Sequence, residues 1–206
     1  MGNNLIVVFP GRFQPFHLGH KKLFDLAKQH FPGADFYITT ADPTSAQINK
    51  EPDRYPFTFE EKRKIIEATG VPSNEVIRTA TPYVPKDLLS NYNPETDKII
   101  FLVGEKDMRD DPRFAFTPLK SGKPSYYQPF TNINDMVPFS AHGYVYAPST
   151  ITFNVGGKII KSASELRNIF ASGDEQTRKE ITTALVGKFN PEIYGILLNK
   201  LAKNNK

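Results

Sequence analysis

The stretch at residues 11–20, GRFQPFHLGH, places several side chains capable of polar chemistry within one short turn. His17 and His20 are three residues apart, so at the start of a helix they lie on the same face. Gly19 between them has no Cβ and lets a ligand approach the backbone. Arg12 adds a guanidinium group whose donors match phosphate oxygens. Together with the N–H groups of a helix N-terminus, these residue types predict a site for a negatively charged phosphate group.

Two simpler interpretations of the histidines compete with this one. A histidine beside a helix start is often a capping or surface residue, and two histidines at this spacing can be metal ligands. The chain has no cysteine, and its other histidines, His30 and His142, lie in no recognisable metal-ligand pattern. Because the stretch directly follows an apolar run at residues 5–9, where parallel sheets bind their ligands, we favour the functional interpretation.

The apolar pattern places the stretch between a strand and a helix. Residues 5–9, LIVVF, are continuously apolar, as is typical of a strand buried on both faces. Residues 18–30 have helical periodicity that ends at Pro-Gly 32–33, and a capping box at 58–61 opens a helix that runs to Gly70. Further strands are expected at 34–40, 74–79, 97–104 and 143–147, and two or three helices from Ser162 onward.

Strands that alternate with helices predict an α/β protein with a Rossmann-like, doubly wound parallel sheet and C-terminal helices. We expect one domain over residues 1–172 and a C-terminal helical segment over 173–206 that packs on it. The stretch 117–143 is rich in Pro, Tyr, Phe and Asn. It is expected to be a long ordered loop or a hairpin insertion.

Composition narrows the choice of partners. The net charge is +4, and the basic excess falls in the segment from Lys158 onward. A bias of this size suits a phosphorylated small molecule at least as well as a nucleic acid, and the absence of an Arg/Lys stripe argues against nucleic acid. No apolar run is long enough to span a membrane, and the lack of cysteine fits a reducing compartment, so we expect a cytoplasmic protein. The sequence leaves homo-oligomers open.

The stretch GRFQPFHLGH resembles the HxGH signature of the nucleotidylyltransferase superfamily. Its first part, GRFQPFH, is similar to the version found in nicotinamide-mononucleotide adenylyltransferases of the archaeal type and of the bacterial NAD-biosynthesis regulator. The resemblance implies transfer of the AMP group of ATP to a phosphorylated acceptor, nicotinamide mononucleotide, with release of pyrophosphate. It also implies that Mg²⁺ is carried by the triphosphate, without a protein metal site.

Residues 161–170, KSASELRNIF, resemble the second superfamily signature, I-S-x-T-x-x-R at a helix N-terminus. Ser162, Ser164 and Arg167 take its serine, threonine and arginine positions, and Lys161 stands where an apolar residue is usual. Taken alone, Ser162 and Glu165 form a capping box, and Arg167 points out of the helix. The match instead implies that two helix N-termini hold one triphosphate from two sides.

The resemblance also assigns roles to the matched residues. The catalytic residues it implies are His17, His20 and Arg167. The nucleotide-binding residues it implies are Gly11, Phe13, Gln14, Pro15, Gly19, Lys161, Ser162 and Ser164. Acceptor contacts are expected from Arg12, from Arg54 in a stretch (51–66) that resembles the R-x-PFT-x-x-E-R motif of the same enzymes, and from Gly104 and Asp107 in FLVGEKD.

Other classes share part of this pattern. Cytidylyltransferases and phosphopantetheine adenylyltransferases usually begin the signature with a TFD-like turn, where this chain has RFQ. Class I aminoacyl-tRNA synthetases share a HIGH-like motif, but the chain lacks a clear KMSKS loop. A Walker-type P-loop is absent, which argues against phosphoryl transfer by that fold. An alternative that is not an enzyme is a nucleotide sensor that keeps the fold without catalytic activity.

Overall fold

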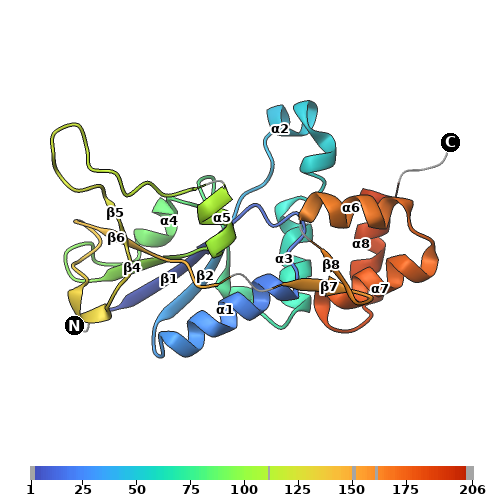
Figure 1. Ribbon diagram of the computed structural model, residues 1–206, viewed down its shortest axis with the longest axis horizontal. Helices are drawn as coiled ribbons and strands as arrows, with labels where there is room; N and C mark the ends of the chain where they lie inside the picture. Colours follow the sequence, from blue (N-terminus) through green and yellow to red (C-terminus); the bar gives the residue numbers. More distant parts are fainter. Residues whose placement is uncertain (1–2, 111, 150–151, 161, 203–206) are drawn as a thin grey trace. The chain divides into compact units, whose positions relative to one another are not determined.

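The computed structural model describes residues 3–110, 112–149, 152–160 and 162–202 (Figure 1). The chain divides into two compact units, and both are discontinuous in sequence. Unit 1 comprises Met1–Gly11, Leu23–Thr40 and Ile77–Thr150, and unit 2 comprises Arg12–Lys22, Ala41–Val76 and Ile151–Lys206. The segment 173–206 thus belongs to the same unit as the histidine stretch.

A parallel sheet forms the centre of unit 1. Its strands are β1 (Leu5–Pro10), β2 (Asp35–Thr40), β3 (Val76–Arg78), β4 (Lys98–Leu102), β5 (Tyr127–Pro129) and β6 (Gly143–Tyr146). Across the described residues their order is β3-β2-β1-β4-β6-β5, and β1 pairs in parallel with both β2 and β4. The strand order reverses direction at β1, which is the doubly wound arrangement of a Rossmann-like α/β fold. The predicted fold class is confirmed.

Both faces of this sheet are covered because its central strands are apolar on both sides. Helix α1 (Leu18–His30) lies along one face (Figure 1). There Phe24 stacks on Phe9 with ring centroids 6.3 Å apart. On the other face, Leu88 of α4 (Lys86–Leu89) packs in a buried cluster with Ile6 and Phe101.

The stretch 117–143 supplies the edge strand β5. This strand pairs in parallel with β6, so β5 and β6 do not form a hairpin with each other. The rest of the stretch includes a single helical turn, η3 (Ile133–Asp135). Tyr127 packs edge-on against Phe114 and Phe101, at centroid distances of 4.7 and 5.5 Å. These aromatic contacts attach the stretch to the core of unit 1.

Unit 2 consists of helices and one hairpin. Its elements are α2 (Ser45–Lys50), η1 (Pro52–Arg54), α3 (Phe59–Ala68), η2 (Ser73–Glu75), β7 (Phe153–Val155), β8 (Lys158–Ile160), α6 (Ala163–Ser172), α7 (Glu175–Val186) and α8 (Pro191–Leu201). The helices expected after Thr58 and from Ser162 onward are confirmed. None of the helices in the described residues combines the length and the apolarity that crossing a bilayer requires.

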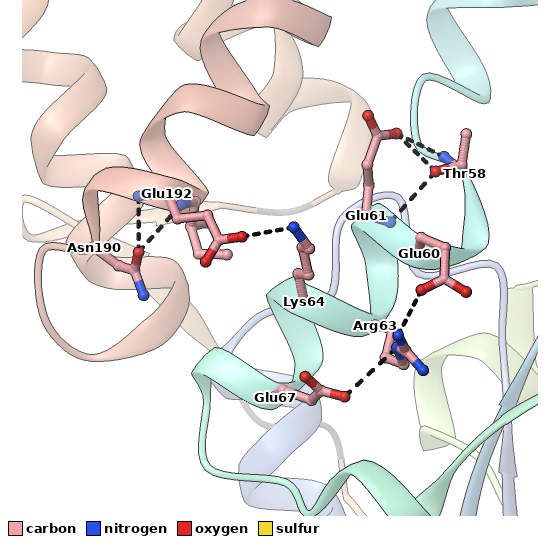
Figure 2. A network of polar contacts seen from close by, with 9 residues as sticks. Thr58, Glu60, Glu61, Arg63, Lys64, Glu67, Asn190 and Glu192 are labelled. Carbon is pink, nitrogen blue, oxygen red and sulfur yellow. Dashed lines mark hydrogen bonds and ion pairs between the residues drawn. The ribbon is translucent and has the colours of Figure 1, made fainter.

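Helix α3 is tied to α8 by charged and apolar contacts, and Figure 2 shows the ion pair of Lys64 with Glu192. Lys64 Nζ lies 2.7 Å from Glu192 Oε1, and Lys200 pairs with Glu61 at 3.2 Å. Exposed pairs of this kind contribute roughly 0–1 kcal/mol each. Burial of apolar side chains such as Ile65 and Ile193 contributes more, about 1.5–3 kcal/mol per side chain. This packing holds α3 and the segment that leads into it.

Candidate active site

His17 and His20 together cap the N-terminus of α1. Nδ1 of His17 accepts a hydrogen bond from the N–H of Gly19 at 3.1 Å, and Nδ1 of His20 accepts one from the N–H of His17 at 3.3 Å. This is the reciprocal geometry of a capping box, with imidazole nitrogens as the acceptors. The three-residue spacing of the histidines is therefore the spacing of the N-cap and N3 positions.

This capping arrangement also determines which ring nitrogen carries the proton. Since each Nδ1 accepts a hydrogen bond, each neutral ring carries its proton on Nε2. Both histidines therefore present an Nε2–H donor away from the helix backbone. A structural role as helix cap and a chemical role as hydrogen-bond donor are compatible, because they use opposite edges of the ring.

The two imidazoles are the centre of a column of stacked rings. Phe153 stacks on His17 at 4.4 Å, His17 on His20 at 3.8 Å, and His20 on Phe16 at 5.1 Å between ring centroids. Burial in this column lowers the pKa of His17 from 6.5 to about 4. Burial, and then the neighbouring His17, lower the pKa of His20 well below 6.5. Both rings are consequently uncharged near neutral pH.

Arg167 links the second predicted signature to the first. Helix α6 begins after Ser162, whose side chain accepts a hydrogen bond from the N–H of Glu165 at 3.1 Å. Arg167 Nη1 donates to the main-chain carbonyl of Gln14 at 2.7 Å, and its Nη2 donates to Ser164 Oγ at 3.0 Å. Arg167 is only 9% exposed, so its side chain does not extend into solvent. Its guanidinium group turns toward the stretch that carries the histidines.

The turn that receives Arg167 is itself held in place. Gln14 Nε2 donates to the carbonyl of Phe57 at 3.2 Å, and Gln14 Oε1 accepts from the N–H of Phe57 at 3.0 Å. Phe13 has a positive φ of 46°, which side-chain-bearing residues rarely adopt. Its ring packs edge-on against Phe16 and His20 at 5.2 and 5.3 Å. Pro15, also buried, follows through a cis peptide bond.

Two exposed arginines converge on the ring of Tyr55. Arg12 Nη1 lies 3.5 Å from the Tyr55 hydroxyl oxygen, and the guanidinium carbon of Arg54 lies 5.8 Å from the ring centroid. Arg54 also pairs with Glu51, with 3.1 Å between Nη1 and Oε1. Tyr55 therefore gathers two guanidinium groups that the sequence separates by more than forty residues.

These two arginines also act electrostatically on Arg167. Burial lowers the pKa of Arg167, Asp53 opposes that shift, and Arg54 and Arg12 reinforce it. Three guanidinium groups therefore lie in one region of unit 2, where Asp53 and Glu51 offset part of their positive charge. Such a region attracts a polyanion, and it is strongest when the anion carries several charges.

The remaining predicted residues are distributed as follows. Gly11, Gly104 and Asp107 belong to unit 1. The N–H of Gly11 donates to the Thr39 carbonyl, and the Gly104 carbonyl accepts from the N–H of Met108 at the start of α5 (Glu105–Asp110), both at 3.1 Å. Asp107 is exposed on that helix. Lys161 lies outside the described residues.

The sequence analysis missed Phe153 and Tyr55. Phe153 lies in β7, which pairs antiparallel with β8. A signal for this hairpin is present: Gly156 and Gly157, with φ of 54° and 80°, form the two-residue connection that a tight hairpin needs. Tyr55 stands beside Arg54, and no residue spacing indicates that it gathers both arginines.

A family model described as cytidylyltransferase-like matches residues 8–169. A bifunctional NMN adenylyltransferase/ADP ribose pyrophosphatase from Francisella tularensis, solved with AMP and a Mn ion, is 18% identical with a TM-score of 0.50. That match covers 97% of this chain and 49% of the other, so the chain spans about half the length of the bifunctional protein.

Two other solved structures match this chain with lower TM-scores. A protein from Vibrio parahaemolyticus described as a nicotinate-nucleotide adenylyltransferase is 17% identical, with a TM-score of 0.48 and coverage of 95% of this chain and 99% of that one. The nicotinic acid mononucleotide adenylyltransferase of Plasmodium falciparum, complexed with APC, is 11% identical, with a TM-score of 0.47 and coverage of 96% of each chain. No curated protein matches the chain. At 18% identity, the likeness to the Francisella tularensis structure establishes the fold and nothing finer.

Proposed function

Because the chain belongs to the cytidylyltransferase-like family, whose members are nucleotidyltransferases, we propose that it transfers the AMP group of ATP to nicotinamide mononucleotide, giving NAD and pyrophosphate. The observation that carries this proposal is the hydrogen bond from Arg167 to Gln14. It brings the arginine of the second signature against the turn of the first within unit 2. The choice of acceptor rests on the likeness of GRFQPFH to the signature of nicotinamide-mononucleotide adenylyltransferases.

The proposed reaction is a direct in-line displacement. A phosphate oxygen of the acceptor forms a bond to the α-phosphorus of ATP while the bond from that phosphorus to the bridging oxygen breaks. Pyrophosphate leaves with the electron pair. A phosphate monoester is already an adequate nucleophile near neutral pH, so catalysis consists mainly of positioning and charge stabilisation.

His17 and His20 suit the α-phosphate. Their Nε2–H groups would donate to its non-bridging oxygens as negative charge builds up in the transition state. Their low pKa values keep both rings neutral, so they offer donors whose protonation does not change across the physiological pH range. The capping hydrogen bonds on Nδ1 hold the rings in the required tautomer before substrate binds.

Arg167, Ser162 and Ser164 suit the β- and γ-phosphates. The N-terminus of α6 contributes N–H donors and the positive end of a helix dipole. Arg167 is held by two hydrogen bonds, so its guanidinium group is ordered before the leaving group arrives. We expect Gly11, Phe13, Gln14, Pro15, Gly19 and Lys161 to complete the nucleotide site.

Arg12 and Arg54 suit the phosphate of the acceptor. Both are exposed and both contact Tyr55, and a phosphate that binds Arg54 competes with Glu51 for its Nη1 donor. Two guanidinium groups can each form paired hydrogen bonds with phosphate oxygens. The acceptor contacts expected from Gly104 and Asp107 stay predictions.

The donor set indicates how a divalent cation would enter. Among the described residues, no group of three or more His, Cys, Asp or Glu is arranged to hold a metal ion. The side chains grouped here are hydrogen-bond donors, which bind phosphate oxygens. They fit a nucleotide that arrives as its Mg²⁺ complex, with the ion held by phosphate oxygens and water.

Pyrophosphate release tests this proposal against its alternatives. We would incubate the protein with MgATP or MgCTP and, in turn, nicotinamide mononucleotide, phosphopantetheine or glycerol 3-phosphate. The proposal predicts release with ATP and nicotinamide mononucleotide. Release with ATP and phosphopantetheine, or with CTP and glycerol 3-phosphate, would instead identify the other two activities. Binding of ATP without release in any combination would identify a nucleotide sensor.

A further inference from the structure

We propose that Phe153 is a positioning residue for His17. Stacked on the imidazole, it holds the ring plane so that the Nε2–H group points to a fixed place at the N-terminus of α1. The effect on the ring stands on the structure alone, whereas the consequence for catalysis rests on the proposed function.

The geometry singles out this aromatic side chain. The ring planes of Phe153 and His17 differ by 21°, and the centroids are 4.4 Å apart, which is a face-to-face contact. Phe153 is 6% exposed, so it is anchored in unit 2 and does not lie loosely on the histidine. On the far side, His20 stacks against His17 at 3.8 Å. The imidazole of His17 is therefore confined between two rings.

Confinement between two rings matters because the hydrogen bond to the His17 ring does not prevent every motion of that ring. The hydrogen bond from Gly19 holds Nδ1, but the ring can still tilt about that contact and swing Nε2 sideways. A ring on each face removes this tilt. A displacement of about 1 Å at a catalytic donor can reduce the rate by about a hundredfold.

Phe153 also controls the charge of His17. Among the described residues, the aromatic rings stacked on this imidazole are those of His20, which titrates, and Phe153, which does not. An apolar ring in place of water disfavours the imidazolium form. A side chain that does not cover the ring as a stacked phenyl group does would leave part of that face open to water, and the pKa of His17 would return toward 6.5.

The same hairpin connects the two halves of the proposed site. Phe153 opens β7, and β8 ends at Ile160, two residues before Ser162 caps α6. The hairpin thus contacts the first histidine directly and leads the chain into the helix that carries Arg167. This connection explains why an aromatic residue outside both signatures can influence the histidine site.

NMR titration of labelled histidine rings tests the proposal in the whole protein. His17 is identified by its absence from the spectrum of a His17→Gln variant. In wild type its pKa is expected at about 4. In Phe153→Leu it should rise toward 6.5, and kcat should fall roughly ten- to a hundredfold. Phe153→Tyr, which keeps the stacked ring, should restore both values.

Phe170→Leu is the matched control. Phe170 is fully buried in unit 2, and its ring contacts Tyr194 and Arg178. Its replacement should lower stability without moving the His17 titration. If Phe153→Leu does not fold, Phe153→Met, which keeps an apolar side chain of similar length, decides the question.

Each outcome bears on one proposal. Wild-type titration and full turnover in Phe153→Leu or Phe153→Met would overturn the role of Phe153. A shifted titration in those variants, in a protein that transfers no nucleotide, would overturn the proposed function and support the effect of Phe153 on the ring.

Discussion

Arg167 donates a 2.7 Å hydrogen bond to the main-chain carbonyl of Gln14, a residue 153 positions away in the sequence. The second donor of the same guanidinium group holds Ser164 at 3.0 Å. One side chain therefore joins the turn before α1 to the first turn of α6. Two segments that resemble separate signatures form one arrangement within unit 2.

Replacing Arg167 by lysine should disrupt these two hydrogen bonds. Lysine offers a point charge in place of the planar fork and cannot bridge both acceptors with the same geometry. We expect turnover to fall about 10²-fold, as on loss of a transition-state donor. The free energy of unfolding should fall by about 1–3 kcal/mol because a buried carbonyl loses its donor. Steady-state kinetics and urea denaturation measure the two effects.

Arg178→Lys is the control for that experiment. Arg178 also bridges two main-chain carbonyls, those of Phe170 and Ala171, each at 3.0 Å. Its replacement should cost comparable stability while turnover stays near the wild-type value. Equal turnover in the two variants would show that Arg167 acts through stability alone.

His20→Ala should lower turnover about 10²–10³-fold, since it removes one Nε2–H donor from the transition state. The fold should persist, with a loss of about 1 kcal/mol from the missing cap contact. His142→Ala serves as the comparison, because His142 is half-buried in unit 1 and has no part in the proposed site. A fully active His20→Ala variant would refute the role assigned to this ring.

Stability should fall as the pH is lowered from 6.5 toward 4. The pKa of His17 is about 4 in the folded protein and 6.5 as an ordinary value, so between these pH values the unfolded chain binds more protons. The free energy of unfolding therefore decreases with falling pH in this window, by up to about 3 kcal/mol from this residue. Denaturation curves at several pH values should show a shallower decrease for His17→Gln. Parallel pH dependences in the two proteins would contradict the burial of a neutral ring.

Gln14→Ala should destabilise the protein by about 2–4 kcal/mol, because the buried N–H and carbonyl of Phe57 both lose their partner. Turnover should fall as well, because the Gln14 side chain holds the turn whose main-chain carbonyl accepts the hydrogen bond from Arg167. Gln128→Ala provides a reference, because that side chain donates one hydrogen bond, to Ser125, at 2.8 Å. Its cost should be about 1 kcal/mol. A Gln14→Ala variant no less stable than Gln128→Ala would contradict this account.

Much of the fold follows from local sequence patterns. The continuous apolar run at 5–9 predicts β1, and the helical periodicity at 18–30 predicts α1, because each pattern extends over nearly the whole element. β5 escapes prediction because it has three residues, one of them proline, and its pairing with β6 depends on tertiary contacts. Strands this short carry no period that could be detected.

Less of the candidate site than of the fold could be predicted from the sequence. The spacing of His17 and His20 identifies a helix N-terminus, and the structure adds that the rings form its capping box. The orientation of Arg167 could not be predicted, because its acceptor is a main-chain carbonyl far away in the sequence. The stacking of Phe153 depends in the same way on a contact between distant segments.

The fate of labelled phosphate tests the central claim most directly. The protein would be incubated with nicotinamide mononucleotide and either [α-³²P]ATP or [γ-³²P]ATP. We predict that the α-label appears in the dinucleotide product and the γ-label in pyrophosphate. Transfer of the γ-label to the acceptor, or no transfer of either label, would contradict a site that brings an acceptor phosphate to the α-phosphorus.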